Sequence, residues 1–224
     1  MVLELLNHGS LEEKLGESPN GWIGEAQIET MAGQVLSALG HMHKVDVIHR
    51  DIKPANIMVH LDDDDGEGGQ VCFKLIDFSV AALDHDAGGK GTLQQSTTER
   101  AGFVGTPHYM SPEQCGAPVD WSHGSPEVGP QTDLWSLGVV MYECLSGRKP
   151  FADGVTDPFK IANQVVRQQP AQSLIERCID CEITKGMCDF VDRAIEKDLT
   201  QRYQSASSMA EDLGKSTSSL PCLV

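Results

Sequence analysis

Residues 49–56 read His-Arg-Asp-Ile-Lys-Pro-Ala-Asn, and this stretch carries more chemical information than any other part of the chain. Asp51 could accept a proton from an attacking hydroxyl, Lys53 could neutralise an oxygen of a phosphoryl group, and Asn56 could hold a divalent cation. Phosphoryl transfer depends mostly on positioning and charge neutralisation, so it needs these three functions close together. The spacing therefore predicts a phosphoryl-transfer site.

The octet resembles the catalytic loop of eukaryotic-type protein kinases, H-R-D-x-x-x-x-N, in which His49 and Arg50 take structural and regulatory places. Lys53, two residues after the aspartate, resembles the serine/threonine-specific version of this loop. In that family the arginine pairs with a phosphate on the activation loop. The nearest hydroxyl residues are at 96–98, so the resemblance implies that an activating kinase phosphorylates one of them.

A second motif, Asp77-Phe78-Ser79, follows the apolar run at 71–76 and resembles the D-F-G element of the same family. The resemblance implies that Asp77 and Asn56 bind Mg²⁺ and that Phe78 packs in the core. Serine replaces the glycine of that element, which restricts the backbone because glycine alone adopts positive φ without strain.

A third motif, at 105–110, resembles the loop on which serine/threonine kinases dock the substrate hydroxyl. In the family its threonine hydrogen-bonds the catalytic aspartate and lysine, so the resemblance assigns Thr106 to Asp51 and Lys53.

Two further motifs resemble scaffolding elements of the kinase domain. The stretch at 111–113 resembles A-P-E, and the resemblance implies a buried ion pair between Glu113 and Arg202. Asp133 opens a stretch that resembles the large central helix, whose aspartate braces the backbone of the catalytic loop.

The beginning of the chain resembles a hinge strand that leads into the first helix of a kinase C-terminal lobe. The resemblance implies an ATP site to which Glu4 and Leu6 contribute their backbones, together with Ser10, Met58 and Asp77.

No glycine-rich loop and no V-A-I-K lysine precede His49, so we expect a C-terminal lobe with the N-terminal lobe absent. The open lobe interface would leave Leu3, Met58 and Phe78 facing solvent as an exposed apolar patch. An adenine ring covered on one face loses roughly 100–150 Å² of apolar burial, about 3 kcal/mol or on the order of 100-fold in affinity.

The expected fold class is α+β and predominantly helical: a protein-kinase-like C-terminal lobe with a small β-hairpin near the catalytic loop. The lobe spans residues 1–214, with a mobile activation loop at 84–102 and a flexible tail at 215–224. Apolar residues at helical spacing predict one long helix that ends before Val47. Further helices are predicted near 132–146, 158–168, 187–197 and 206–213, and strands at 57–59 and 71–76.

The formal net charge of −16 disfavours nucleic acids and anionic membranes as partners and favours basic ones. The most apolar stretch, at 134–145, contains Glu143 and is shorter than the ~18 residues of a membrane span. The acidic N-terminus shows no secretory signal, so the expected location is cytoplasmic or nuclear.

The resemblance implies a serine/threonine protein kinase lobe that transfers the γ-phosphoryl of ATP to a protein Ser/Thr hydroxyl, with ATP and Mg²⁺ as cofactors. The alternative is a catalytically inactive kinase-like binding module, either a pseudokinase or a truncated fragment. The missing lysine favours the alternative, whereas the intact Asp51, Asn56 and Asp77 oppose it.

Overall fold

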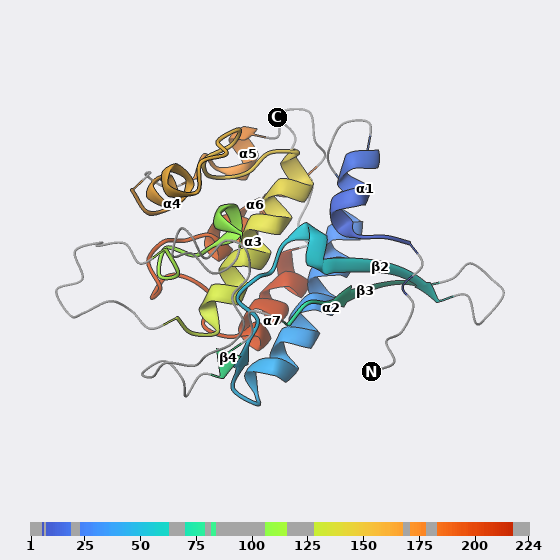
Figure 1. Cartoon of the computed structure of the whole chain (residues 1–224). Coiled ribbons are helices and arrows are strands. Elements are labelled where there is room, and N and C mark those ends of the chain that lie inside the picture. Colours follow the sequence, from blue (N-terminus) through green and yellow to red (C-terminus); the bar gives the residue numbers. More distant parts are fainter. Residues whose placement is uncertain are drawn as a thin grey trace.

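The computed structural model describes residue 6 and residues 8–18, 23–62, 70–78, 82–83, 106–115, 128–167, 171–177 and 183–216. This part of the chain is helix-rich, with two short antiparallel strand pairs at its edge (Figure 1). The helices are α1 (Leu11–Glu17), α2 (Glu25–His43), α3 (Gln131–Ser146), α4 (Pro158–Arg167), α5 (Leu174–Arg177), α6 (Lys185–Ala194) and α7 (Ala206–Ser216). The strands are β1 (Val47–Ile48), β2 (Ile57–Asp62), β3 (Gln70–Leu75) and β4 (Ala82–Leu83), and two 3₁₀ turns are η1 (Pro54–Asn56) and η4 (Pro107–Tyr109).

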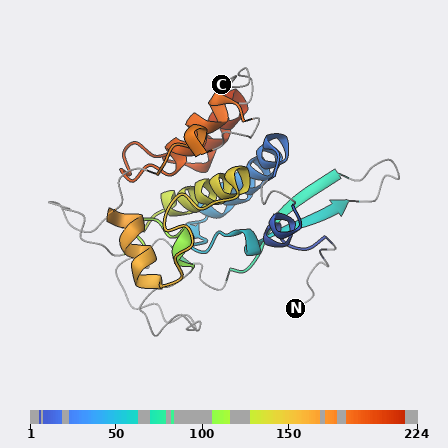
Figure 2. The ribbon, with the colours of Figure 1, turned by 90° about the horizontal axis from the view of Figure 1, so that it is seen from above.

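The core is built around α3, which lies beside α2 and also contacts α5, α6 and η4 (Figure 2). Apolar residues occur on all sides of this helix, and even Asp133 and Ser136 are buried. A helix that is apolar all round is stable only inside a protein. The helix ends at Gly147, whose φ of 67° is the left-handed conformation that glycine adopts freely. None of the helices in the described part of the chain combines the length and apolarity that crossing a membrane requires.

The contact between α3 and α6 depends on Gly138. A Cβ atom at this position would lie 2.7 Å from the Ala194 Cβ and 3.0 Å from the Ile195 Cγ2. We expect Gly138→Ala to lower the free energy of unfolding by about 1–3 kcal/mol, because the helices must move apart. Urea titration followed by circular dichroism measures this change.

The matched control is Gly33→Ala, in the interior of α2, where an added Cβ meets nothing within 4 Å. This variant should gain roughly 0.5–1 kcal/mol, because alanine favours the helix over glycine. Equal stability of the two variants would contradict the close approach at Gly138.

The β2–β3 hairpin is fixed along both of its outer edges. The Gln34 side chain, from α2, accepts a hydrogen bond from the Phe73 amide and donates one to the Val71 carbonyl at 3.3 Å. On the other side the Val59 amide donates to the Gly9 carbonyl at 2.8 Å. The hairpin is thereby held between the segment before α1 and the face of α2.

The predicted helix-rich fold with a hairpin next to the catalytic loop is present, but several element boundaries were wrong. The helix predicted at 187–197 begins at Lys185, because the Thr184 hydroxyl caps it by accepting a hydrogen bond from the Met187 amide at 3.1 Å. It ends at Ala194, where the backbone of Ile195 leaves the helical conformation. Residues 215 and 216, predicted to begin the flexible tail, belong to α7, which continues to Ser216, and residues 217–224 lie outside the described residues. The short α5 and the β1–β4 pair were not predicted, and the loop predicted at 84–102 lies outside the described residues.

Candidate active site

The loop at 49–53 joins β1 to the turn η1 and is anchored from beneath by apolar side chains. Ile52 and Pro54 are buried, and Ile57 at the start of β2 is fully enclosed. Because these residues fix the backbone on both sides, the polar side chains between them have defined positions.

Asp51 lies at the centre of a hydrogen-bond cluster. Its Oδ2 accepts a hydrogen bond from the Lys53 Nζ at 2.7 Å and one from the Asn56 Nδ2 at 3.2 Å. Its Oδ1 accepts from the Thr106 amide at 3.1 Å and from the Thr106 hydroxyl at 3.2 Å. The Lys53 Nζ also donates to the Thr106 Oγ1 at 3.0 Å. The structure therefore brings together all four residues that were predicted to be catalytic.

Asp77 is placed next to this cluster by the residue before it. The Ile76 amide donates to the Asn56 carbonyl at 2.9 Å, and the Ile76 carbonyl lies 3.1 Å from the His49 Nε2. Asp77 itself has a φ of 65°, a conformation that aspartate tolerates better than most residues. The Asn56 side-chain amide group donates to the Asp51 carbonyl at 2.8 Å and to the Asp51 carboxylate. The side-chain oxygen of Asn56 is therefore the atom left to bind a cation.

A carboxylate and an amide oxygen fit the ligand preference of Mg²⁺, which usually takes one or two protein ligands and completes its shell with water and phosphate. No group of three or more His, Cys, Asp or Glu side chains that could hold a metal occurs among the described residues. The donor set at Asn56 and Asp77 therefore suits a magnesium ion that arrives with a phosphate ligand rather than a closed metal site.

Phe78 does not pack in the core, where the family motif alone implied it would lie, but is exposed, as we expected for a C-terminal lobe that stands alone. Its ring lies against His49, with the ring centroids 5.3 Å apart, but 54% of its surface is exposed. One ring contact covers only part of a phenyl group, so the residue forms an apolar surface beside Asp77.

The residues predicted to bind the nucleotide are only partly described. Glu4 lies outside the described residues, and Leu6 and Met58 are half-buried. Ser10 forms a bridge with Met58 and caps α1, because its hydroxyl accepts a hydrogen bond from the Glu13 amide at 3.2 Å. The Ser10 hydroxyl is thus already engaged within α1, and its contact with a nucleotide stays a prediction.

Asp133 holds the backbone of the catalytic loop from the start of α3. Its two carboxylate oxygens accept hydrogen bonds from the amides of His49 and Arg50, each at 2.9 Å. Arg50 has a φ of 68°, a strained conformation for a residue with a side chain. Hydrogen bonds to a buried carboxylate are strong enough to maintain such a conformation.

His43 was not predicted to take part, yet its Nε2 lies 2.9 Å from the Asp133 Oδ2. The two residues are 90 positions apart, and His43 sits in an ordinary amphipathic helix pattern, so the sequence held no signal for this contact. His43 therefore supports the catalytic loop through Asp133.

The Arg50 side chain projects a buried Nε that has no hydrogen-bond partner among the described residues. The residues at 96–98, predicted to carry the phosphate that this arginine would bind, lie outside the described part of the chain.

Glu113 and Arg202 form the ion pair that the sequence motifs implied. The Arg202 guanidinium donates to both carboxylate oxygens, at 2.7 and 3.3 Å, and the two side chains are 0% and 2% exposed. The Thr132 hydroxyl also donates to Glu113, at 3.0 Å, and the guanidinium lies 4.7 Å from the centroid of the Trp135 ring. The pair joins the segment after η4 to the segment between α6 and α7.

A cluster of polar side chains between η4 and the end of α3 was not predicted from the sequence. The Glu143 carboxylate accepts hydrogen bonds from the Tyr109 hydroxyl and the Lys149 ammonium, both at 2.7 Å. Burial and the neighbouring Glu143 raise the pKa of Tyr109 well above its ordinary value, so this hydroxyl remains a donor. Burial and Lys149 lower the pKa of His108, which lies 3.0 Å from the Val155 carbonyl.

A family model described as protein kinase domain matches residues 1–213. A probable serine/threonine-protein kinase of Streptomyces coelicolor is 34% identical over 213 residues, which are 95% of this chain and 27% of the relative. The serine/threonine-protein kinase PknB of Mycolicibacterium smegmatis is 34% identical over 187 residues, or 83% of this chain and 25% of the relative. Mitogen-activated protein kinase kinase 1c of Physcomitrium patens is 31% identical over 208 residues, or 90% of this chain and 51% of the relative.

The chain thus spans between about a quarter and a half of the length of these relatives. The similarity runs through the scaffold as well as the catalytic loop, because the match extends from the first residue almost to the end of α7. The chain belongs to the protein kinase domain family.

Proposed function

We propose that this chain supplies the catalytic groups of a serine/threonine protein kinase, which transfers the γ-phosphoryl of ATP to a hydroxyl of a protein substrate. The observation that carries the proposal is the Asp51 carboxylate, held on one oxygen by Lys53 and on the other by Thr106. The names of the relatives, all of them protein kinases, support the same reaction.

In this proposal Asp51 orients the acceptor hydroxyl and takes its proton. A carboxylate already fixed by several donors needs no reorganisation when the hydroxyl arrives. Lys53 bridges Asp51 and Thr106, so its ammonium group lies where the acceptor and the transferred phosphoryl group would meet. There it would neutralise the charge of a phosphoryl oxygen.

Asn56 and Asp77 would hold Mg²⁺, which neutralises the charge of the nucleotide phosphates when it is bound. The support for this role is the hydrogen bond from the Ile76 amide to the Asn56 carbonyl, which brings the backbone before Asp77 to Asn56 beside Asp51.

We propose further that residues 1–214 correspond to the C-terminal lobe of the kinase domain. The 224 residues contain no glycine-rich loop and no V-A-I-K lysine ahead of His49, and Phe78 beside the catalytic loop is largely exposed. A nucleotide bound to this lobe alone is covered on one face only. Its affinity is then expected to be on the order of 100-fold weaker than in a complete domain.

The test compares the 224-residue chain with the same chain joined in frame to the N-terminal lobe of the Streptomyces relative. We expect the joined protein to phosphorylate peptides whose one hydroxyl residue is Ser or Thr, to leave a Tyr peptide unmodified, and to stop when Mg²⁺ is removed by EDTA. Calorimetry should show ATP binding on the order of 100-fold weaker for the chain alone.

Tight MgATP binding by the joined protein without any phosphate transfer would contradict the proposed catalysis. That outcome would favour the alternative, an inactive kinase-like binding module.

A further inference from the structure

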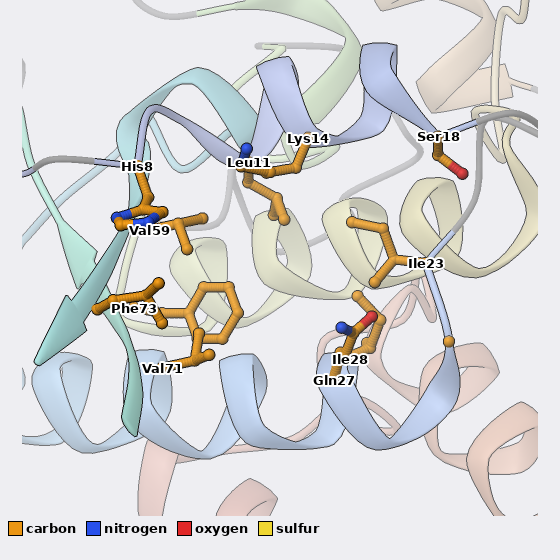
Figure 3. A pocket seen from close by; sticks show the side chains of 12 residues that line it. His8, Leu11, Lys14, Ser18, Ile23, Gln27, Ile28, Val59, Val71 and Phe73 are labelled. Carbon is orange, nitrogen blue, oxygen red and sulfur yellow. The ribbon is translucent and has the colours of Figure 1, made fainter. Parts of the chain in front are cut away.

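A cavity of about 390 Å³ lies between α1, α2 and the β2–β3 hairpin (Figure 3). One wall consists of two cross-strand pairs, Val59 with Phe73 and Leu61 with Val71. Leu11 and Ile28 extend this apolar lining onto the two helices. The volume is within the range of about 300–1,000 Å³ that is usual for small-molecule sites.

The cavity is separate from the proposed nucleotide site. Successive side chains of a strand point to opposite faces, so Val59 and Leu61 lie on one face of β2 and Met58 on the other. None of the residues at 49–56 lines the cavity, and neither does Met58. A ligand here would therefore occupy the opposite face of the hairpin from Met58.

The charge at the rim is unusual for this chain. The ionisable side chains that line the cavity among the described residues are His8 and Lys14, and no carboxylate is present. The chain as a whole carries 33 Asp and Glu residues against 17 Lys and Arg residues, so a lining with a lysine and without a carboxylate stands out and favours an anionic over a cationic ligand.

The Lys14 ammonium can contact a ligand with little loss of stability, because its present ion pair is exposed. It contacts the Glu17 carboxylate at 2.8 Å, but these two side chains are 36% and 67% exposed. Ion pairs at such exposure contribute little, so an anionic group in the cavity can replace Glu17 as the partner of Lys14. Figure 3 shows Lys14 on α1 above the apolar floor, with Gln27 and Ile28 on α2 opposite.

We propose that this cavity binds a small amphiphile with an apolar body and an anionic head, of the size of a medium-chain carboxylate. At roughly 30 Å³ for each water-sized group, the cavity accommodates about a dozen heavy atoms. The apolar body lies against the hairpin pairs, and the head contacts Lys14. The proposal does not depend on catalysis, because it concerns residues outside the catalytic cluster.

The test uses calorimetric titration of the 224-residue chain with three ten-carbon probes: decanoate, decanol and decyltrimethylammonium, each below its aggregation limit. Decanoate should bind with a Kd on the order of 10⁻⁴ M. Decanol should bind several-fold more weakly because it lacks the charge, and the cation should bind most weakly.

Two variants test whether the probes bind in this cavity. Lys14→Gln should weaken decanoate binding by about 3–10-fold and leave decanol unchanged, which corresponds to one exposed charge contact. Val71→Trp puts an indole into the cavity and should abolish binding of both probes, while strand pairing is retained because tryptophan favours strands. The matched control is Lys44→Gln, an exposed lysine after α2 that does not line the cavity.

Decanoate binding that survives Val71→Trp would place the ligand elsewhere, such as on the exposed Phe78, and would overturn the proposal. Equal binding of decanoate and the cationic probe would do the same. A second binding measurement with anionic-lipid vesicles distinguishes a free amphiphile from a membrane lipid as the ligand. Binding to the vesicles without binding of decanoate also overturns the proposal. Melting temperatures of all variants show whether a loss of binding reflects unfolding.

Discussion

Replacing Asp51 by asparagine is expected to lower the turnover number for phosphate transfer by about 10²–10⁴-fold, the usual contribution of a general base. The asparagine keeps the size of the side chain and one oxygen, so Thr106 can retain a hydrogen bond. It cannot accept a proton from the attacking hydroxyl, and it removes the negative charge that Lys53 contacts at 2.7 Å.

The loss should appear in the turnover number rather than in nucleotide affinity. The proposed magnesium ligands, Asn56 and Asp77, are unchanged, and the Asn56 side chain still donates to the carbonyl of residue 51. The measurement is the initial rate of phosphate transfer to a serine peptide at saturating ATP, in the protein joined to an N-terminal lobe. Calorimetric ATP titration is performed alongside.

Asp46→Asn is the matched control for this substitution. Asp46 is exposed five residues before Asp51, and its φ of 57° is a conformation that asparagine also adopts readily. The control should keep the parental rate. A rate within two- to three-fold of the parent for Asp51→Asn itself would refute the assignment of Asp51 as the base.

The second large effect concerns stability: Arg202→Met is expected to lower the free energy of unfolding by about 3–5 kcal/mol. The substitution leaves the Glu113 carboxylate buried, with the Thr132 hydroxyl as its one remaining donor among the residues that the structure describes. It also removes the guanidinium from the face of Trp135 and from the Glu196 carbonyl, to which its Nε donates at 2.9 Å.

The double variant Glu113→Gln with Arg202→Met distinguishes two effects on stability. One is the loss of the ion pair, and the other is the burial of a Glu113 carboxylate without its partner. If the stranded carboxylate dominates, the double variant should be more stable than Arg202→Met alone. The control is Arg193→Met, which breaks an exposed contact with Asp212 and should change stability by less than about 1 kcal/mol. Chemical denaturation gives all these values, and equal effects at positions 193 and 202 would refute the importance of burial.

The sequence was most informative where the chemistry is local. Asp51, Lys53 and Asn56 lie within one short loop, so their spacing alone predicted that they would meet, and Thr106 joined them through a family motif. The long helix α2 and the buried helix α3 were also predictable, because the period and the extent of an apolar pattern reflect burial directly.

Contacts between distant segments were not predictable from such patterns. The approach of His43 to Asp133 and that of Tyr109 to Glu143 depend on how helices and loops are oriented in three dimensions. The exposure of Phe78, by contrast, was predicted from the segments expected around it rather than from its apolar character, since an apolar side chain is buried only if another segment covers it. The cavity beneath the hairpin is likewise a property of packing, formed where two helices and two strands do not fill the space between them.

The hydrogen bonds that Gln34 and Gly9 make along the two outer edges of the hairpin also protect the protein against aggregation. An open strand edge offers free amide and carbonyl groups to a second molecule and can template intermolecular sheet formation. Here the side-chain amide of Gln34 hydrogen-bonds backbone groups at the outer edge of β3, and the Gly9 carbonyl accepts a hydrogen bond from one backbone amide of β2. Self-association of this chain should therefore proceed through the apolar surface at Phe78, which is reversible and sensitive to detergent, rather than through the fibril-like addition of strands.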